Sequence, residues 1–484
     1  MSVSIYPGKQ RMLLALLILF CVSTWLQAEP VVTIRNNGDS ANRVDIVLLS
    51  EGYTAGELSQ WAIDAEAGIV DLFLNEPFNE YQKYFNVHRI DVASMESGAD
   101  HPETGVYKNT AFDATYNCSG VQSLICISNS KVATVLGNSI QPNQMDIVIV
   151  VVNDLEYGGS GGQYAVASLH TDSQEIILHE LGHSFGLLAD EYTSSPPPCN
   201  NTVEPPEPNV TMQTSRNLIK WNQGGGPPAG WIEFSTPIPT VTAIPSGAGL
   251  YQGAKYCASG LYRPTSNSKM NTLYAPFGPI NEEQLVKRFY NFVSPIDSSM
   301  PVAPSLVLQQ GSSSVFQVTV PMPMSMPLDV TWYVNGLVSG SGLAFTLDTS
   351  ALAIGFHTVK AEARDTTAKV RYDPASVLMD SRLWSVEITS GDGDGDGVPD
   401  SQDNCINEAN TPQRDTDNDG YGNRCDPDFN NDNMVNGADL AYFKTKFFSN
   451  DPDADLNGDG IVNGGDLAIF KLFFFKPPGP SGLN

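Results

Sequence analysis

The chain has 484 residues, of which 41% are hydrophobic and 17% charged, so it can form several folded domains. Its formal net charge of −28 argues against nucleic acid and anionic membranes as partners. Residues 391–466 hold 18 acidic side chains against four basic ones, which is half of that net charge. Carboxylates at this density repel one another unless cations neutralise them, which indicates metal binding.

The first 28 residues have the order of a secretory signal peptide. Lys9 and Arg11 precede the apolar run MLLALLILFCV, and the small residue Ala28 stands before Glu29. The run is too short to span a bilayer comfortably, and no other stretch is suited to do so. We therefore expect an exported protein without a transmembrane segment in its mature chain.

Six cysteines remain once Cys21 is removed with the signal. An even number in an exported chain favours disulfides, although several connectivities are open. Clustered cysteines can also bind zinc, but the chain has no CxxC pair. The simplest connectivity is sequential, which predicts the disulfides Cys118–Cys126, Cys199–Cys257 and Cys405–Cys425.

The first part of the mature chain alternates strands with helices. Residues 44–50 and 145–152 are continuous apolar, β-branched runs, as in buried strands, whereas 85–93 alternates like a half-buried strand. A helix follows the T-x-x-E capping box of Thr54 and Glu57. This pattern predicts a mixed α/β layer. The expected buried face of the helix consists of Leu58, Trp61, Ala65, Ile69 and Leu72.

The stretch HELGHSFGLLADEY at 179–192 has the features of a catalytic zinc site. His179 and His183 lie four residues apart, so on a helix both imidazoles project from one face and can bind one zinc ion. Glu180 lies one step around the helix, where it can act as general base on a water at the metal. Gly186 can adopt the left-handed conformation that ends the helix and turns the chain back.

A catalytic zinc usually has three protein ligands, and the third is not fixed by this pattern. The usual position of a third histidine is Ala189. Asp190 and Glu191 are the nearby candidates, and His170 is a more distant one. The glycine-rich segment 158–168 is either a flexible turn or the edge strand of a cleft, to which a peptide would add as an extra strand.

These residues resemble the HExxHxxGxxxDE signature of the IgA peptidase family of secreted bacterial zinc metallopeptidases, which are metzincin-like enzymes. VDIVLLSEGYT, VVVNDLEYGGSGG and SKMNTLYAPFGPINEEQ are also similar to segments of that family. The resemblance implies an endopeptidase acting on proteins or peptides. Asp190 is then the third zinc ligand, with Glu191 as the alternative, and Glu180 is the base. Met270 is then the methionine turn beneath the metal.

After residue 192 the character of the sequence changes twice. The stretches SPPPC, PPEP and GGGPPAG indicate irregular structure from Thr193 to Thr265, held by the Cys199–Cys257 disulfide. After Pro301, short strand-like segments such as SSVFQVTV and LDVTWYVNG alternate with turns. This alternation predicts one β-sandwich of immunoglobulin-like size.

The acidic stretch 392–426 resembles a thrombospondin type 3 repeat. Alternate carboxylates in a glycine-rich loop can wrap one calcium ion with oxygen ligands, whereas a solvated acidic linker would not explain the regular spacing. Cys405 and Cys425 match the disulfide of that repeat. The predicted calcium ligands are Asp392, Asp394, Asp396, Asp400, Asp415, Asp417 and Asp419.

Two further loops, 428–439 and 455–466, resemble EF-hand loops, and a short apolar helix follows each. The duplicated pattern resembles a dockerin, a module that binds cohesins. Gly437–Ala438 and Gly464–Gly465 differ from the familiar contact pairs, which argues against a cohesin. The partner that the resemblance implies is cohesin-like or on the cell surface. The predicted calcium ligands are Asp428, Asn430, Asp432, Asn436, Asp439, Asp455, Asn457, Asp459, the carbonyl of Ile461, Asn463 and Asp466.

We thus expect an α+β protein, secreted or on a bacterial cell surface, with one catalytic Zn²⁺ and several structural Ca²⁺. Its peptidase domain should hold a mixed twisted sheet with a backing helix and the zinc helix. The alternative is a calcium-dependent adhesin or scaffold-bound binding protein with an inactive peptidase fold. The intact zinc motif favours the enzyme. The expected parts are a signal peptide (1–28), a metzincin-like zinc peptidase domain (29–298), an immunoglobulin-like β-sandwich (299–390), a thrombospondin type 3-like repeat (391–427), a dockerin-like module (428–476) and a flexible tail (477–484).

Overall fold

The computed structural model describes residues 28–194, 199–245 and 247–484, so the predicted signal peptide lies outside the described residues, apart from Ala28. Two compact units interleave along the chain. The first comprises the chain up to residue 75, then 85–192 and 267–276, and the second comprises 76–84, 193–266 and 277–484. Across the described part of the chain, no helix has both the length and the apolar character needed to cross a membrane.

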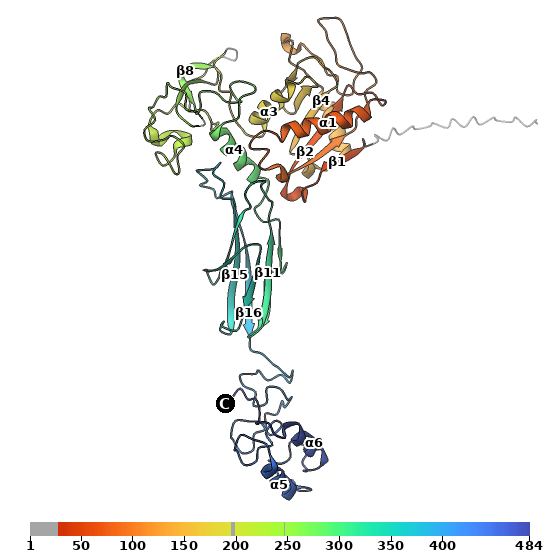
Figure 1. Cartoon of the computed structure of the whole chain (residues 1–484). Helices are drawn as coiled ribbons and strands as arrows, with labels where there is room; N and C mark the ends of the chain where they lie inside the picture. The colour runs from red at the N-terminus through yellow and green to blue at the C-terminus, as the bar shows by residue number, and fades with distance from the viewer. Residues whose placement is uncertain (1–27, 195–198, 246) are drawn as a thin grey trace, which may run out of the picture. The chain divides into compact units, whose positions relative to one another are not determined.

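The first unit is built on a mixed six-stranded sheet with the strand order β1–β3–β2–β4–β6–β5 (Figure 1). The four inner strands are parallel, and β1 and β5 run antiparallel along the two edges. The strands are β1 (Val31–Arg35), β2 (Val44–Glu51), β3 (Phe85–Ile90), β4 (Ile147–Val152), β5 (Gly159–Ser160) and β6 (Ala165–Ser168), and the helices are α1 (Leu58–Leu72), α2 (Asn129–Ser139) and α3 (Ser173–Ser184).

Helices cover both faces of this sheet, which explains why β2 is buried along its whole length and β4 along nearly all of it. On one face, Leu48 of β2 borders the same small cavity as apolar residues of α1 and Ile177 of α3. On the other face, Val47 of β2 belongs to a core cluster that includes Leu136 of α2. The predicted face of α1 is confirmed, except that Leu58 is only half-buried.

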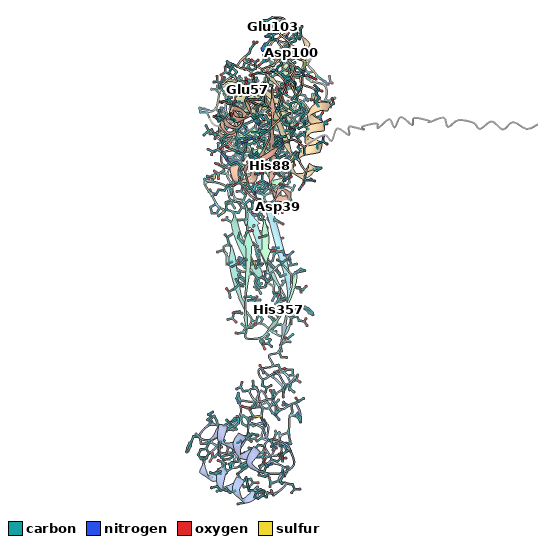
Figure 2. All side chains as sticks on the ribbon, turned by 90° about the vertical axis from the view of Figure 1, so that its right-hand side faces the viewer. Asp39, Glu57, His88, Asp100, Glu103 and His357 are labelled. Carbon is teal, nitrogen blue, oxygen red and sulfur yellow. A yellow bond between two sulfur atoms is a disulfide. The ribbon has the colours of Figure 1, made fainter. Side chains whose placement is uncertain are left out.

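Strand β3 is more buried than its alternating sequence predicts, because it lies between β1 and β2. Its polar side chains find partners inside the sheet. His88, labelled in Figure 2, places Nε2 3.0 Å from Asp45 Oδ1 and Nδ1 3.0 Å from Thr33 Oγ1. Asn86 accepts a hydrogen bond of 2.8 Å from the backbone N–H of Asn37. The alternation therefore marks hydrogen-bonded polar groups and not a solvent-facing side.

The second unit begins with largely irregular chain that still has a packed core. The hairpin β7 (Tyr251–Ala254) and β8 (Cys257–Arg263) is its regular part, and the helix α4 (Pro279–Tyr290) follows. Asp365 accepts hydrogen bonds from Tyr81 (2.6 Å) and from Tyr290 of α4 (2.8 Å). These buried bonds connect the segment 76–84 and α4 to Asp365, which directly follows the strand β15 (Gly355–Arg364). The domain boundary predicted at residue 298 is therefore not a boundary in the packing.

Residues 298–389 form a five-stranded sheet, β10–β16–β15–β12–β13, and a three-stranded sheet, β14–β11–β9. All pairs are antiparallel except β10 with β16. The sheets share a core around Phe316, Trp332 and Trp384, the two tryptophan rings stacking with centroids 5.8 Å apart. The strands are β9 (Ser298–Met300), β10 (Ser305–Gln309), β11 (Ser313–Thr319), β12 (Asp329–Val334), β13 (Leu337–Ser341), β14 (Ala344–Asp348), β15 (Gly355–Arg364) and β16 (Met379–Thr389).

Residues 391–484, the C-terminal part, contain the helices α5 (Gly437–Lys446) and α6 (Gly464–Phe473) among loops (Figure 1). One core cluster includes Cys405 and Cys425 together with Phe443 of α5 and Phe470 of α6. This core spans the boundary predicted between residues 427 and 428. The structure contains all three predicted disulfides.

The end of the chain is not the flexible tail that its sequence predicts. The N–H of Gly479 donates to the carbonyl of Cys425 (3.0 Å), and that of Gly482 donates to the carbonyl of Asp403 (2.8 Å). The side-chain amide of Asn484 donates to the carbonyl of Asp419 (3.1 Å). The tail follows the acidic loops because their carbonyl groups need hydrogen-bond donors that the loops do not supply.

Candidate metal centre

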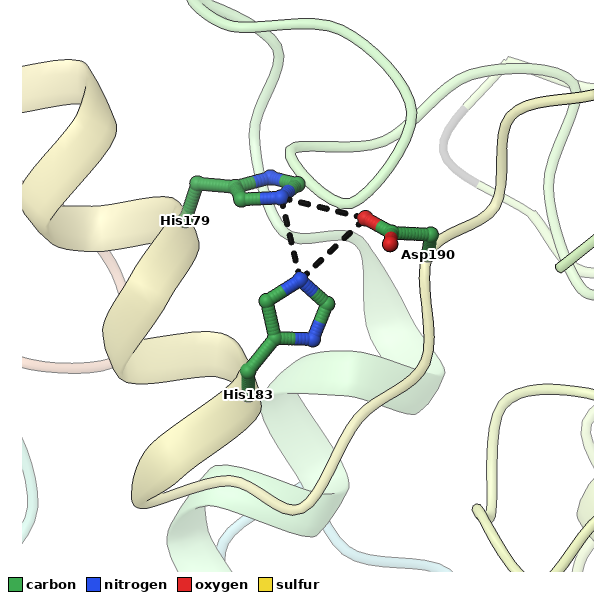
Figure 3. Close-up of side chains that lie close together, drawn as sticks. All are labelled: His179, His183 and Asp190. Carbon is green, nitrogen blue, oxygen red and sulfur yellow. Dashed lines mark hydrogen bonds and ion pairs between the residues drawn. The ribbon is translucent and has the colours of Figure 1, made fainter. Parts of the chain in front are cut away.

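Helix α3 carries the two histidines of the zinc motif and directs both imidazoles to one point. His183 Nε2 lies 3.1 Å from His179 Nε2, and Asp190 Oδ1 lies 3.1 Å from each of these nitrogens (Figure 3). The one ligand atom that each residue offers lies within 4.8 Å of the other two. Two imidazole nitrogens and one carboxylate oxygen form a donor set that suits catalytic zinc.

The turn that brings Asp190 back to the helix is made by Leu187 and not, as predicted, by Gly186. Leu187 has a left-handed φ of 55°, whereas Gly186 is not among the residues with positive φ. The N–H of Leu187 donates to the carbonyl of His183 (3.1 Å), which is the single bond of an αL helix ending, and the N–H of Leu188 donates to the carbonyl of Gly182 (2.9 Å). The left-handed residue, Leu187, thus lies one position after Gly186. The candidate ligand Asp190 likewise lies one position after Ala189.

Backbone carbonyls hold both histidine rings in place. His179 Nδ1 lies 2.9 Å from the carbonyl of Lys269, and His183 Nδ1 lies 2.7 Å from the carbonyl of Leu188. Lys269 is itself fixed by an ion pair of 2.6 Å with Glu175 on α3. Bonds to Nδ1 select the tautomer whose Nε2 lone pair is free, and Nε2 is the atom that faces the other donors.

The segment around Met270 packs beneath this centre. Met270 is fully buried, and its carbonyl accepts a hydrogen bond of 2.7 Å from the N–H of Glu191. The Glu191 carboxylate accepts a hydrogen bond of 2.8 Å from Ser268 Oγ. Glu191, the alternative ligand, is thus buried against this segment and is not one of the three converging donors. His170 is also outside that group, and its Nδ1 accepts from the N–H of Asp172 (3.2 Å).

Glu180 is a half-buried carboxyl group near the donors without being one of them. Burial raises its pKa, and the charges of His179 and His183 partly oppose that shift. Its carboxylate packs against Gly161, where a Cβ atom would lie 1.7 Å from Glu180 Oε2. Burial lowers the pKa of His183, but the hydrogen bond and charge of Asp190 outweigh burial and the net shift is upward. The centre therefore favours the protonated, positively charged form of His183.

The first acidic loop gathers four carboxylates. Asp392, Asp394 and Asp396 bring one oxygen each within 4.8 Å of one another. Burial and the charges of Asp396, Asp403 and Asp392 raise the pKa of Asp394. Asp403 is fully buried, and its Oδ2 has no hydrogen-bond partner, as is also true of Asp394 Oδ2. These orphaned oxygens fit a cation with oxygen ligands.

Asp403 lies outside the predicted ligand set, which includes Asp400. Asp400 uses Oδ1 to accept a hydrogen bond of 2.7 Å from the N–H of Gly393. Asp403 is the twelfth residue of a loop that begins at Asp392, the position of the closing carboxylate in an EF-hand loop. The same spacing was applied to the later loops and would have identified it.

The second acidic loop repeats this arrangement. Asp415, Asp417 and Asp419 converge, and Asp426 is again the twelfth residue. Burial and the charges of Asp419, Asp417 and Asp428 raise the pKa of Asp426 to about 8. A carboxyl group with so high a pKa is ionised at neutral pH only in part, unless a cation is bound to it.

The two EF-hand-like loops share one local geometry. Each ends in a capping box at the start of its helix, Asn436 with Asp439 before α5 and Asn463 with Asp466 before α6. Asp439 and Asp466 are fully buried, and Asp439 Oδ1 lacks a hydrogen-bond partner. Asn433 takes the left-handed conformation (φ 65°) that Gly460 has in the other loop (φ 94°), as its position predicts.

One family model matches part of the chain. Residues 32–242, which include His179, Glu180, His183 and Asp190, match the family described as IgA Peptidase M64. The M64 peptidase family is a group of metallopeptidases, and the match covers less than half of the chain. No curated protein matches the chain.

Several solved structures are similar to short segments of the chain. A type II cohesin–dockerin domain from Bacteroides cellolosolvens is 35% identical over 10% of this chain and 85% of that one, with a TM-score of 0.10. Fibronectin(III)-like modules of Clostridium thermocellum are 16% identical over 19% and 94%, with a TM-score of 0.14. A quinonprotein alcohol dehydrogenase-like protein of Bacteroides thetaiotaomicron is 14% identical over 19% of each chain, with a TM-score of 0.15.

Proposed function

We propose that the first unit is a zinc-dependent endopeptidase in which His179, His183 and Asp190 hold one zinc ion and Glu180 is the general base. The observation that carries the proposal is the convergence of three donor atoms near the half-buried carboxyl group of Glu180, which is not itself a donor. The family match supports the peptidase class. The three disulfides and the bacterial family support an extracellular location.

A zinc ion at these donors would supply Lewis acidity, polarising the scissile carbonyl group and lowering the pKa of a water molecule. Glu180 then takes a proton from the attacking water and donates it to the leaving amine nitrogen. Burial raises the pKa of Glu180, which makes the carboxylate a stronger base. The carbonyls of Lys269 and Leu188 keep the two imidazoles fixed throughout.

The test compares the zinc-loaded wild-type protein with Glu180→Ala on casein, with peptide products measured by mass spectrometry and bound zinc by elemental analysis. We expect cleavage by the wild type only, with equal zinc content in both proteins. Ala in place of the exposed Glu233 is the matched control and should cleave like the wild type. Absence of cleavage by a zinc-loaded wild type would refute the enzyme and favour a binding protein with an inactive peptidase fold.

We further propose that the four acidic loops of the C-terminal part bind calcium as structural ions. Unpartnered buried oxygens on Asp394, Asp403 and Asp439 support this assignment. The two sheets before it are proposed to be an immunoglobulin-like sandwich, and the paired loops with α5 and α6 a dockerin-like module for a cohesin-like or cell-surface partner. Calcium titration followed by calorimetry tests the ion sites, and an unchanged melting temperature at saturating calcium would refute them.

A further inference from the structure

One pocket of the C-terminal part has basic walls in strongly acidic surroundings. It encloses about 340 Å³ between the segment closed by the Cys405–Cys425 disulfide and the start of the loop 455–466. Residues 391–484 contain only two arginines, Arg414 and Arg424, and both line this pocket. Among the described residues that line it, none is acidic. The pocket therefore suits an anion, which the rest of the C-terminal part would repel.

Arg424 carries a charge that nothing in the described chain neutralises. Within the residues that the structure describes, its guanidinium group makes no hydrogen bond or ion pair. Its Nε is covered by the protein and still lacks a hydrogen-bond partner, so the chain does not offset the cost of burying it. A guanidinium group is always charged and has five N–H donors. An arginine left unpaired among so many carboxylates indicates that its partner belongs to another molecule.

The two walls of the pocket are fixed to each other. Arg414 reaches across to the loop 455–466, where its Nη1 lies 3.2 Å from Asp455 Oδ2 and its Nη2 donates to the carbonyl of Asp455. The buried side-chain amide of Asn423 donates to the carbonyls of Pro452 (2.9 Å) and Asp453 (3.2 Å). The walls are therefore in place before a ligand binds. Because Asp455 neutralises Arg414, Arg424 supplies the net positive charge.

The size and the chemistry of the walls define the ligand that fits. A cavity of about 150 Å³ suffices for benzene, so this larger pocket accommodates a substituted six-membered ring, whereas one carboxylate side chain would fill only part of it. Thr411 and Asn457 bring a hydroxyl and an amide group to the walls, which suits a ring that carries hydroxyl groups. A carboxylate matches the planar guanidinium fork. A phosphate matches it too, but its second negative charge adds repulsion from the acidic loops nearby.

We propose that this pocket binds a hexuronate, a sugar ring with one carboxylate, and that the carboxylate pairs with Arg424 beside Arg414. The same chemistry is offered by a free sugar acid and by the end of an acidic polysaccharide chain. All the lining residues belong to the second unit, so the site is separate from the proposed zinc centre. The proposal is independent of the peptidase and calcium assignments, because none of its steps uses a bound metal ion.

Calorimetric titration of the full chain tests the carboxylate. Galacturonate and glucuronate are compared with galactose and glucose, which carry a neutral CH₂OH group in place of the carboxylate, in buffer that contains calcium on both sides of the titration. We expect at least one uronate to bind about 10-fold or more tightly than its neutral sugar, as hydrogen bonds to a charged group imply. Equal binding of acid and neutral sugar, or no binding of either uronate, would overturn the proposal.

Further probes separate the hexuronate from other anions. Galactose 6-phosphate and glucose 6-phosphate place a phosphate on the same ring, and an N-acetylated glutamate amide carries a carboxylate without a ring. Tighter binding of either sugar phosphate, or binding of the glutamate amide as tight as that of the uronates, would overturn the proposal. Trimers of the bound uronate then identify the source. Binding as tight as that of the monomer indicates a polysaccharide end, and weaker binding indicates the free sugar acid, either of which supports the site.

Variants assign the binding to this pocket. Arg424→Gln should weaken uronate binding about 10-fold or more, and Arg424→Lys should retain part of the affinity because it keeps the charge without the planar fork. Lys471→Gln removes the same charge from an exposed position outside the lining and should bind like the wild type.

A second pair of variants leaves both arginines in place. Ala409→Trp fills the exposed rim of the pocket, whereas Asn407→Trp adds the same ring at an exposed position outside the lining. Only the first should lose uronate binding, and equal melting temperatures would show that both variants are folded. Uronate binding unchanged in both Arg424→Gln and Ala409→Trp, or lost equally in each variant and its control, would refute the pocket.

Discussion

The proposed zinc ligands and those of the first acidic loop each come from twelve consecutive residues, 179–190 and 392–403. The zinc donors are oriented from far away in the chain, since Lys269 fixes His179 and Ser268 and Met270 fix the segment that carries Asp190. The acidic loops are folded instead by their own amides; Gly395, for example, donates its N–H to Asp392 (2.9 Å).

This difference has an electrostatic consequence. The proposed zinc centre combines one carboxylate with two imidazoles. The carboxylate and the imidazoles attract each other, and neutral carbonyl groups hold the imidazole rings. The acidic loops place like charges together, and the raised pKa of Asp394 and Asp426 records that repulsion together with burial. The three donors of the proposed zinc centre are thus brought together by the fold, whereas we expect the acidic loops to gain stability from bound cations.

The largest effect should follow from Asp190→Ala, which removes the only carboxylate of the zinc donor set. We expect loss of bound zinc and of peptidase activity with little change in the melting temperature, because the fold preforms the centre. Competition with a zinc chelator measures the affinity. Glu191→Gln should retain more zinc, and zinc content indifferent to Asp190 would refute the ligand assignment.

Asp403→Asn tests whether the twelfth residue closes the first acidic loop. The change removes one charge from a fully buried site whose Oδ2 is unpartnered, so calcium affinity should fall about tenfold or more. Calorimetric titration measures this. Asp400→Asn is the matched control with a smaller expected effect, and the reverse order would restore Asp400 as the principal ligand.

Ser268→Ala tests whether a residue far away in the chain supports the proposed zinc centre. Removing the hydroxyl takes one hydrogen-bond donor from the buried Glu191 carboxylate, next to Asp190 in the chain, and zinc affinity should fall about 10-fold, as is typical for outer partners of metal sites. Chelator competition measures it. Ser266→Ala, two residues earlier, is the control. An unchanged affinity in the Ser268 variant would mean that the zinc centre depends on local geometry alone.

The last prediction concerns the pH dependence of stability. Because the pKa of Asp426 is raised to about 8 in the folded protein, its neutral form stabilises the calcium-free fold. In a calcium chelator, the melting temperature of the C-terminal part should fall as pH rises from about 4 to about 8. Saturating calcium should reverse this trend, because it binds the ionised carboxylates. A calcium-free melting temperature that rises over this range would contradict the burial of Asp426 as a neutral acid.

The sequence by itself determined the parts whose pattern is local: the strands β2 and β4, the buried face of α1, the sequential disulfides and the candidate metal residues. The sequence also contains the spacing that makes Asp403 and Asp426 the twelfth residues of their loops, although the predicted ligand sets do not include these two residues. Tertiary structure decided the rest. Strand β3 is interior because β1 covers it, Glu191 points to Ser268, and the tail binds loop carbonyls. The physical reason is that periodicity and spacing encode what one segment buries or repeats. Which distant group completes a buried hydrogen bond or walls a pocket depends on segments that only the fold brings together.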